Sequence, residues 1–221
     1  MPPKIKTNIL KLKKRTIKKL KPNNLNVIKE VIKGRDDYPS SVLKMLSSYG
    51  DVPIIAYSIK RTPVSKLLTT ALSTLSQEFK DRLQKSEYDE LFHLYLEITL
   101  ESGKKLLIEK NAVINIITSL KRPQEEIKII NKAPSGLTLN VMMEKTKKLM
   151  GSKFLTYSAN NNNCQDFIVS IMRANKIGSA DDIKFVKQDT KFLFKNLPYL
   201  RKFSNTVTTI GARVDSLKNI I

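Results

Sequence analysis

The clearest alternation of hydrophobic and polar residues lies between residues 91 and 100. One side of this segment would carry Phe92, Leu94, Leu96, Ile98 and Leu100, and the other His93, Tyr95, Glu97 and Thr99. A period of two predicts a half-buried strand. Residues 101–104 predict a hairpin turn, after which residues 105–117 continue as one or two strands. Further short strands are predicted at residues 53–59, 125–131 and 153–158.

Other segments carry the 3.6-residue period of amphipathic helices. Pro63 is a favourable first residue for a helix whose inner face would hold Val64, Leu67, Leu68, Ala71, Leu72 and Leu75. Helices are also predicted at residues 40–49, at residues 139–150 before Gly151, and at residues 163–175. Strands in the middle with helices on either side predict an α+β fold, in which a small antiparallel sheet packs against helices.

The two ends of the chain differ from this central pattern. Residues 4–21 form a basic amphipathic segment with an apolar side made by Ile5, Ile9, Leu12 and Leu20, widened by Leu10 and Ile17. We place the boundary of the folded domain at Gly50-Asp51. The expected organisation is therefore a basic helical arm over residues 1–50, a domain over residues 51–177 and a helical extension over residues 178–221.

The charge of the chain predicts a class of binding partner. The formal net charge is +20, and residues 1–33 contain 11 Lys and Arg against one acidic residue, Glu30. This segment is expected to attract a polyanion, either nucleic acid or an anionic membrane surface, or else an acidic protein face. The chain has 32 Lys but only 8 Arg, a bias that an AT-rich genome also produces. Scarce Arg argues against sequence-specific reading of DNA.

Residue counts exclude several kinds of site. One Cys and one His rule out an intrachain disulfide, a zinc or iron–sulfur site with several cysteines, and a metal site with two imidazoles. No cofactor or metal is expected. The sequence has no run of about 18 apolar residues, and its basic N-terminus lacks the apolar block of a signal peptide. An intracellular, non-secreted protein is therefore expected.

The single Cys and the single His are the candidates for chemistry. Cys164 follows four asparagines that favour helix capping, and Phe167, Ile168, Ile171 and Met172 continue its stripe on the predicted helix. A thiol at a helix N-terminus is favoured as thiolate, and His93 on a strand could act as its general base. The alternative is that Cys164 is a small core residue and that His93 is a surface or satisfied core residue.

The elements Phe92-His93-Leu94-Tyr95-Leu96 and Asn163-Cys164-Gln165-Asp166-Phe167, separated by a hairpin, resemble the circularly permuted papain-like family, which includes lecithin–retinol acyltransferase. The resemblance covers about residues 88–175. It implies a permuted papain-like fold with Cys164 as nucleophile and His93 as base. Animal acyltransferases of the family carry a second His on the next strand, whereas this chain has Glu109 there. Glu109, with Asn111 second, is therefore the candidate for orienting His93.

Two functions follow from these observations. The resemblance implies a cysteine hydrolase or acyltransferase acting on a lipid, a peptide or an isopeptide. The alternative is a non-enzymatic structural or virion protein that binds nucleic acid, membrane or capsid proteins through residues 1–33. The Lys- and Asn-rich flanks are similar to those of virus-encoded members of the family. Both functions place the protein in a larger assembly. The structural function implies that the protein is located in a virion.

Overall fold

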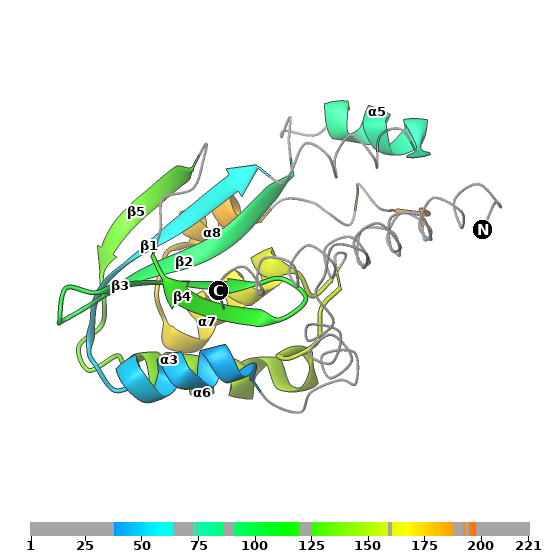
Figure 1. The fold of residues 1–221 in the computed structure, drawn as a ribbon. Helices are drawn as coiled ribbons and strands as arrows, with labels where there is room; N and C mark the ends of the chain where they lie inside the picture. The colour runs from blue at the N-terminus through cyan, green and yellow to red at the C-terminus, as the bar shows by residue number, and fades with distance from the viewer. Residues whose placement is uncertain are drawn as a thin grey trace.

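A computed structural model of the chain describes residues 38–63, 73, 75–85, 91–119, 125–158, 161–187, 192 and 195–197. The predicted helix at residues 4–21, most of the helix predicted after Pro63 and most of the C-terminal extension lie outside these residues. At the centre is an antiparallel sheet of five strands in the order β4-β3-β2-β1-β5 (Figure 1). Its strands are β1 (Ile54–Pro63), β2 (Phe92–Leu100), β3 (Lys105–Lys110), β4 (Ile114–Thr118) and β5 (Glu126–Lys132).

Helices cover one face of this sheet (Figure 1). α7 (Cys164–Asn175) contacts β2 and β3, α6 (Leu139–Met150) packs on α7, and α3 (Ser40–Tyr49) contacts β4 and α6. The core lies between the sheet and these helices, where Leu94, Leu96 and Ile98 meet Phe167, Ile168 and Ile171. The fold is thus α+β with a small open antiparallel sheet packed against helices, as the sequence predicts.

Most predicted elements agree with the structure. Both helices at residues 40–49 and 139–150 have the predicted bounds, and the hairpin strands divide into β3 and β4 around a turn at residues 111–113. α3 lies in the segment assigned to the arm, and its Val42 is fully buried in the core. Two further helices are described. α5 (Gln77–Lys85) lies between β1 and β2 in sequence and buries Phe79 and Leu83, and α8 (Ala180–Val186) follows α7.

The first correction concerns Pro63. The sequence predicts that Pro63 begins a helix, but in the structure it is the last residue of β1, paired with Phe92. Proline lacks a backbone N–H and is therefore tolerated at the end of a strand. The residues from Ile59 to Pro63 continue the pairing with β2, and this lengthens β1 beyond the predicted strand.

The second correction concerns residues 153–158, which do not form the predicted strand. A 3₁₀ turn, η1 (Gly151–Lys153), comes first, and the rest is irregular except for one bridge between Ser158 and Asn162. The Asn162 side-chain amide donates to the carbonyls of Lys153 and Thr156 at 2.8 and 2.7 Å. These contacts bend the segment into a loop, because side-chain donors then replace the partner strand.

The third correction concerns β2, which is buried on both faces instead of one. Leu94, Leu96 and Ile98 face the core, while Tyr95 and Glu97 on the opposite face are 0% and 7% exposed. Polar groups are buried when hydrogen-bond partners satisfy them, and alternation along one strand cannot reveal partners from other strands.

Candidate active site

The β2–β3 hairpin brings His93 and Glu109 together. Tyr95 on β2 is paired with Glu109 on β3, so His93 lies diagonally across from Glu109. His93 Nε2 and Glu109 Oε2 are 2.9 Å apart, and their side chains are 17% and 8% exposed. Diagonal neighbours on one face of an antiparallel pair lie within reach of long side chains. The sheet therefore presents a carboxylate-bound imidazole at the start of β2.

Cys164 reaches the same imidazole from the opposite layer. It is the first residue of α7, is 7% exposed, and interacts with His93 through a hydrogen bond and through charge. Asn163 caps the helix, because its side chain accepts from the backbone N–H groups of Gln165 and Asp166 at 2.9 and 3.2 Å. The Asp166 side chain in turn accepts from the Asn163 N–H, which completes a capping box.

The surroundings of His93 favour its charged form. Burial works to lower the pKa of His93, but the charge and hydrogen bond of Cys164, followed by those of Glu109, outweigh it and raise the pKa to about 10. An imidazolium held between a thiolate and a carboxylate explains the direction of this shift. His93 is therefore expected to be an imidazolium near neutral pH.

Of the two candidates for orienting His93, the structure places only Glu109 beside it. Asn111 lies in the turn between β3 and β4, where its backbone N–H donates to the Val113 carbonyl at 3.0 Å. The register would set Asn111 opposite His93 if the pairing continued, but β3 ends at Lys110 and residues 111–113 turn into β4. The structure thus groups Cys164, His93 and Glu109, and leaves Asn111 in the turn.

A buried lysine behind the site is a feature that the sequence analysis missed. Lys110 is 0% exposed, and its Nζ donates to the Lys153 carbonyl at 2.8 Å and to Asn162 Oδ1 at 3.3 Å. Burial lowers the pKa of Lys110 to about 8, although the Asp166 charge acts to raise it. Lys110 and Asn162 together fix the loop that leads into Cys164. The available signal was that Lys110 shares the strand side of Leu106 and Ile108, which period-two alternation places in the core.

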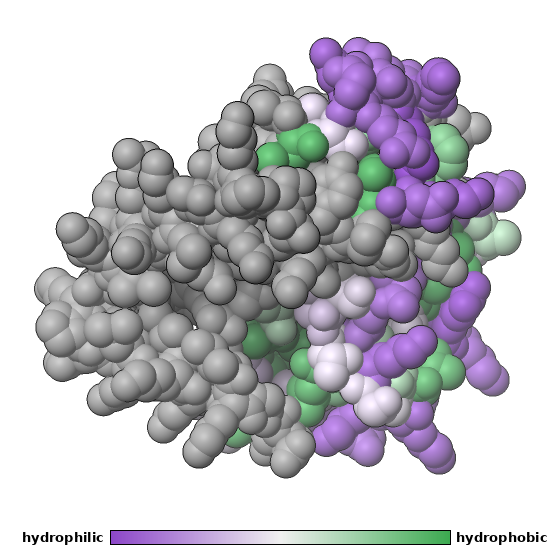
Figure 2. All heavy atoms as spheres, turned by 90° about the vertical axis from the view of Figure 1, so that its right-hand side faces the viewer, coloured by the Kyte–Doolittle hydropathy of each residue, from purple (hydrophilic) through white to green (hydrophobic). Residues whose placement is uncertain are grey.

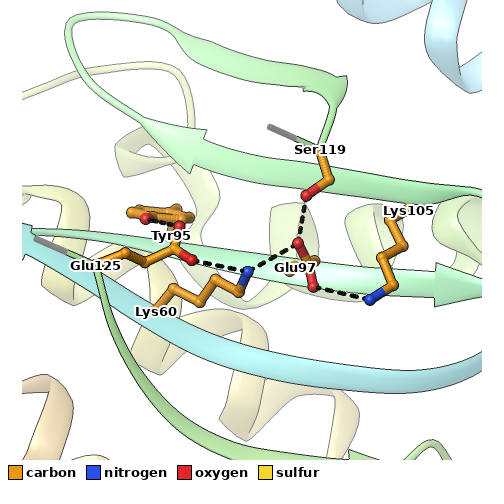
Figure 3. Close-up of polar contacts among 6 residues, drawn as sticks. All are labelled: Lys60, Tyr95, Glu97, Lys105, Ser119 and Glu125. Carbon is orange, nitrogen blue, oxygen red and sulfur yellow. Dashed lines mark hydrogen bonds and ion pairs between the residues drawn. The ribbon is translucent and has the colours of Figure 1, made fainter. Parts of the chain in front are cut away.

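A second polar cluster covers the face of the sheet opposite the helices (Figure 3). Lys60 Nζ lies between Glu97 Oε2 at 2.9 Å and Glu125 Oε2 at 3.1 Å. Tyr95 donates its hydroxyl proton to Glu125 Oε1 at 2.5 Å, and Ser119 donates to Glu97. Burial acts to raise the pKa of Glu97, but hydrogen bonds from Ser119 and Lys60 outweigh it, so that pKa lies below its ordinary value.

The described residues also bear on metal sites, on a separate hollow and on membrane-spanning helices. Among the described residues, no group of three or more His, Cys, Asp or Glu side chains is arranged to hold a metal ion. A hollow between α6 and the end of α7 is lined by Lys145, Lys148, Leu149, Ala174, Asn175 and Lys176, far along α7 from Cys164. In the described part of the chain, no helix has both the length and the apolar character needed to cross a membrane.

The chain was compared with models of protein families, with curated proteins and with solved structures, and none of them matches it. The chemistry of the site must therefore be argued from its own residues.

Proposed function

We propose that this protein is a thiol-dependent acyl-transfer enzyme, with Cys164 as nucleophile, His93 as base and acid, and Glu109 as the orienting carboxylate. The contact between His93 Nε2 and Glu109 Oε2 at 2.9 Å is the observation that carries the proposal. Because Nε2 is occupied, Nδ1 is the ring nitrogen left for the thiol. A nucleophile, a base and a group that orients the base form the arrangement required for nucleophilic catalysis.

The proposed reaction has two steps. The Cys164 thiolate attacks the carbonyl carbon of an ester or amide, and His93 protonates the leaving alcohol or amine as the C–O or C–N bond breaks. Water or a second acceptor then loses a proton to His93 and attacks the thioester, which releases the thiol. The cap occupies the N–H groups of Gln165 and Asp166, so the backbone N–H of Cys164 would be a donor for the oxyanion.

The resemblance to the permuted papain-like family supports this assignment at the level of order and local structure. His93 lies on a strand, Glu109 on the next strand, and Cys164 at the start of a later helix. We also propose that the chain has a permuted papain-like fold. Lipids, peptides and isopeptides all contain a carbonyl that a thiolate can attack, so the substrate class is left to substrate screening.

Alkylation of the only cysteine tests the proposal. Iodoacetamide should label Cys164 of the full chain at pH 6–7, well below the ordinary thiol pKa of about 8.5. His93→Ala should slow labelling by about tenfold or more, because the imidazolium that stabilises the thiolate is removed. Asn111→Ala is the matched control and should label at the wild-type rate. Equal rates for wild type and His93→Ala would leave Cys164 as an ordinary core residue.

The net charge of +20 favours a second function, which does not depend on the site. We propose that residues 1–33 bind a polyanion, either nucleic acid or an anionic membrane surface, or capsid proteins within a larger assembly. Eleven basic residues against one acidic residue give this segment a strong positive field. A protein that only assembles would keep this property after Cys164→Ser, whereas an acyl-transfer enzyme would lose its reaction.

A further inference from the structure

Tyr95 lies at the centre of the polar residues on the outer face of the sheet. Along β2, His93 precedes it and Glu97 follows it on the same face. Across the sheet, Tyr95 is paired with Lys60 on β1 and with Glu109 on β3. The residue is 0% exposed, so its ring fills the space between the candidate site and the cluster of Figure 3.

The ring of Tyr95 stacks on the imidazole of His93. Their centroids are 6.2 Å apart, and the angle between the ring planes is 27°. An aromatic face attracts a cation, so this arrangement favours the imidazolium over the neutral ring.

The hydroxyl of Tyr95 is anchored at the opposite end of the ring. It donates to Glu125 Oε1 at 2.5 Å, and Glu125 Oε2 accepts from Lys60 Nζ at 3.1 Å. Lys60 also binds Glu97 at 2.9 Å. A buried phenol with a charged acceptor is restricted to one orientation, because rotation would leave the buried carboxylate with one partner fewer.

We propose that Tyr95 is a positioning residue for His93, with its ring stacked on the imidazole and its hydroxyl fixed by Glu125. This inference rests on the proposed function. It adds an aromatic neighbour of His93 on the same strand, in a position where sequence alone shows only an alternating strand. The carboxylate Glu109 then sets the direction of the imidazole, and the Tyr95 ring sets its plane.

The titratable groups around His93 come from several elements. Cys164 approaches from α7, Glu109 from β3 and Tyr95 from β2, while Lys60 on β1 and Glu125 before β5 form the next shell. All variants below therefore leave Cys164 and Glu109 intact, so that changes in His93 report on Tyr95 and its anchor.

The test uses the fact that the chain has one His and one Cys. NMR titration of the single imidazole gives the His93 pKa, and iodoacetamide labelling gives the reactivity of Cys164. Tyr95→Leu removes the stacked ring and should lower the His93 pKa by about half a unit and slow labelling up to about fivefold. Tyr95→Phe keeps the ring and loses only the anchor, so its effects should have the same direction and be smaller.

Two further variants make the test specific. Glu125→Ala removes the acceptor of the Tyr95 hydroxyl and should resemble Tyr95→Phe, and the double variant should add nothing further, because both remove the same anchor. Tyr57→Phe is the matched control, since Tyr57 is also buried but donates to no group near His93; its hydroxyl oxygen accepts from the Gly178 N–H at 2.9 Å. Tyr57→Phe should leave the His93 titration and the labelling rate unchanged.

The outcomes are distinguishable. An unchanged His93 titration in both Tyr95→Leu and Tyr95→Phe would overturn the proposal. If Tyr95→Leu does not fold, Tyr95→Phe and Glu125→Ala decide the question by the same two measurements. If His93→Ala leaves labelling unchanged while the Tyr95 variants still move the His93 titration, the acyl-transfer function fails and the positioning role stands.

Discussion

Glu109 accepts from an imidazole that is largely, but not fully, buried. A carboxylate stabilises the imidazolium by charge as well as by hydrogen bonding, whereas an amide offers only the hydrogen bond. Its distance of 2.9 Å from His93 and its low exposure make this difference large. The charge of Glu109 is therefore expected to matter more than its shape.

The Glu109→Gln variant separates these two contributions. The His93 pKa should fall by about one unit or more, because the charge that supports the imidazolium is lost while the side-chain volume is kept. Labelling of Cys164 at pH 6–7 should slow in parallel. NMR titration of His93 measures the first effect, and Asn111→Ala serves as the control with an unchanged titration. A larger effect from Asn111→Ala than from Glu109→Gln would reverse the assignment of the orienting residue.

Lys110 makes stability depend on pH. Its pKa in the folded state is about 8, below the ordinary value of 10.5, because burial disfavours the ammonium. Between these two values the unfolded chain holds a proton that the folded chain does not, so the free energy of unfolding rises with pH in this window. Below pH 8 both states are protonated, and the cost of burying the charge is fully present.

The Lys110→Met variant tests this linkage. The free energy of unfolding of the wild type should rise relative to that of Lys110→Met between pH 8 and 10, with a slope of up to about 1.4 kcal/mol per pH unit. Urea unfolding at several pH values gives the difference, in which groups common to both proteins cancel. The exposed Lys145→Met is the control and should give a flat difference. A flat difference for Lys110→Met too would show that the buried amine does not titrate in this range.

At the scale of elements, α7 carries both the packing against the sheet and the proposed nucleophile. Its apolar stripe lies against β2 and β3, and its capped end holds Cys164 beside His93. Asn163 supplies the cap through two hydrogen bonds, and Asp166 returns one. The same short segment therefore fixes the helix start and the direction of the thiol.

Removal of this cap should affect stability and reactivity together. Asn163→Ala should lower the free energy of unfolding by about 1 kcal/mol, because two backbone donors lose their acceptor. Cys164 labelling should also slow, since the first turn of α7 is less well fixed. Urea denaturation and iodoacetamide labelling measure the two effects. Asn163→Ser provides the control, because serine also caps helices and should restore most of both.

Much of this element pattern could be predicted from sequence. Asparagine before an apolar stripe gave the start of α7, and strict alternation gave β2, because both signals are local. The loop at residues 153–158 could not be predicted, since its shape depends on Asn162 and Lys110, which are contributed by other segments. A β-rich local pattern does not reveal that side-chain donors take the place of a partner strand.

The candidate site, too, could be predicted from sequence only in part. Cys164 and His93 were identified from their single occurrence and their positions on a helix and a strand. The choice between Glu109 and Asn111 required the register of the β2–β3 hairpin, and the burial of Tyr95 required partners on β1 and before β5. The position of Glu109 beside His93 and the burial of Tyr95 both depend on pairing between strands far apart in sequence. The hydrophobic pattern of a single strand carries no information about this pairing.

At the scale of the whole molecule, the chain carries a large excess of positive charge. On the face shown in Figure 2, most described residues are hydrophilic, and hydrophobic ones appear as patches between them. The chain carries 40 Lys and Arg against 20 Asp and Glu. Such a charge is expected to attract polyanions over a distance of about one Debye length, roughly 8–10 Å at physiological salt.

Deletion of residues 1–33 tests the contribution of the N-terminal segment. The truncated protein should bind DNA or anionic vesicles more weakly, and the binding that is lost should be the strongly salt-dependent part. Binding measured at several salt concentrations gives this slope. Because α3 packs on the core through Val42, the deletion stops before α3 and the thermal transition of the domain should persist.

A second variant distinguishes charge from apolar docking. Replacement of Ile5, Ile9 and Leu12 by Ser keeps the lysines and removes the apolar side of the segment. Polyanion binding should survive this change with its salt slope intact. Loss of binding together with a flat salt slope would instead identify docking to a protein groove.

The strand order also predicts which contacts form first during folding. β2, β3 and β4 are consecutive neighbours, so the hairpin that joins His93 to Glu109 closes over only 16 positions. Cys164 follows 71 positions after His93 and can join only when α7 docks, which requires a much larger loop to close. During synthesis the imidazole and its carboxylate should therefore meet first, while the thiol stays unactivated. The proposed nucleophile would therefore meet its proposed base only when α7 docks on β2 and β3, after the hairpin has closed.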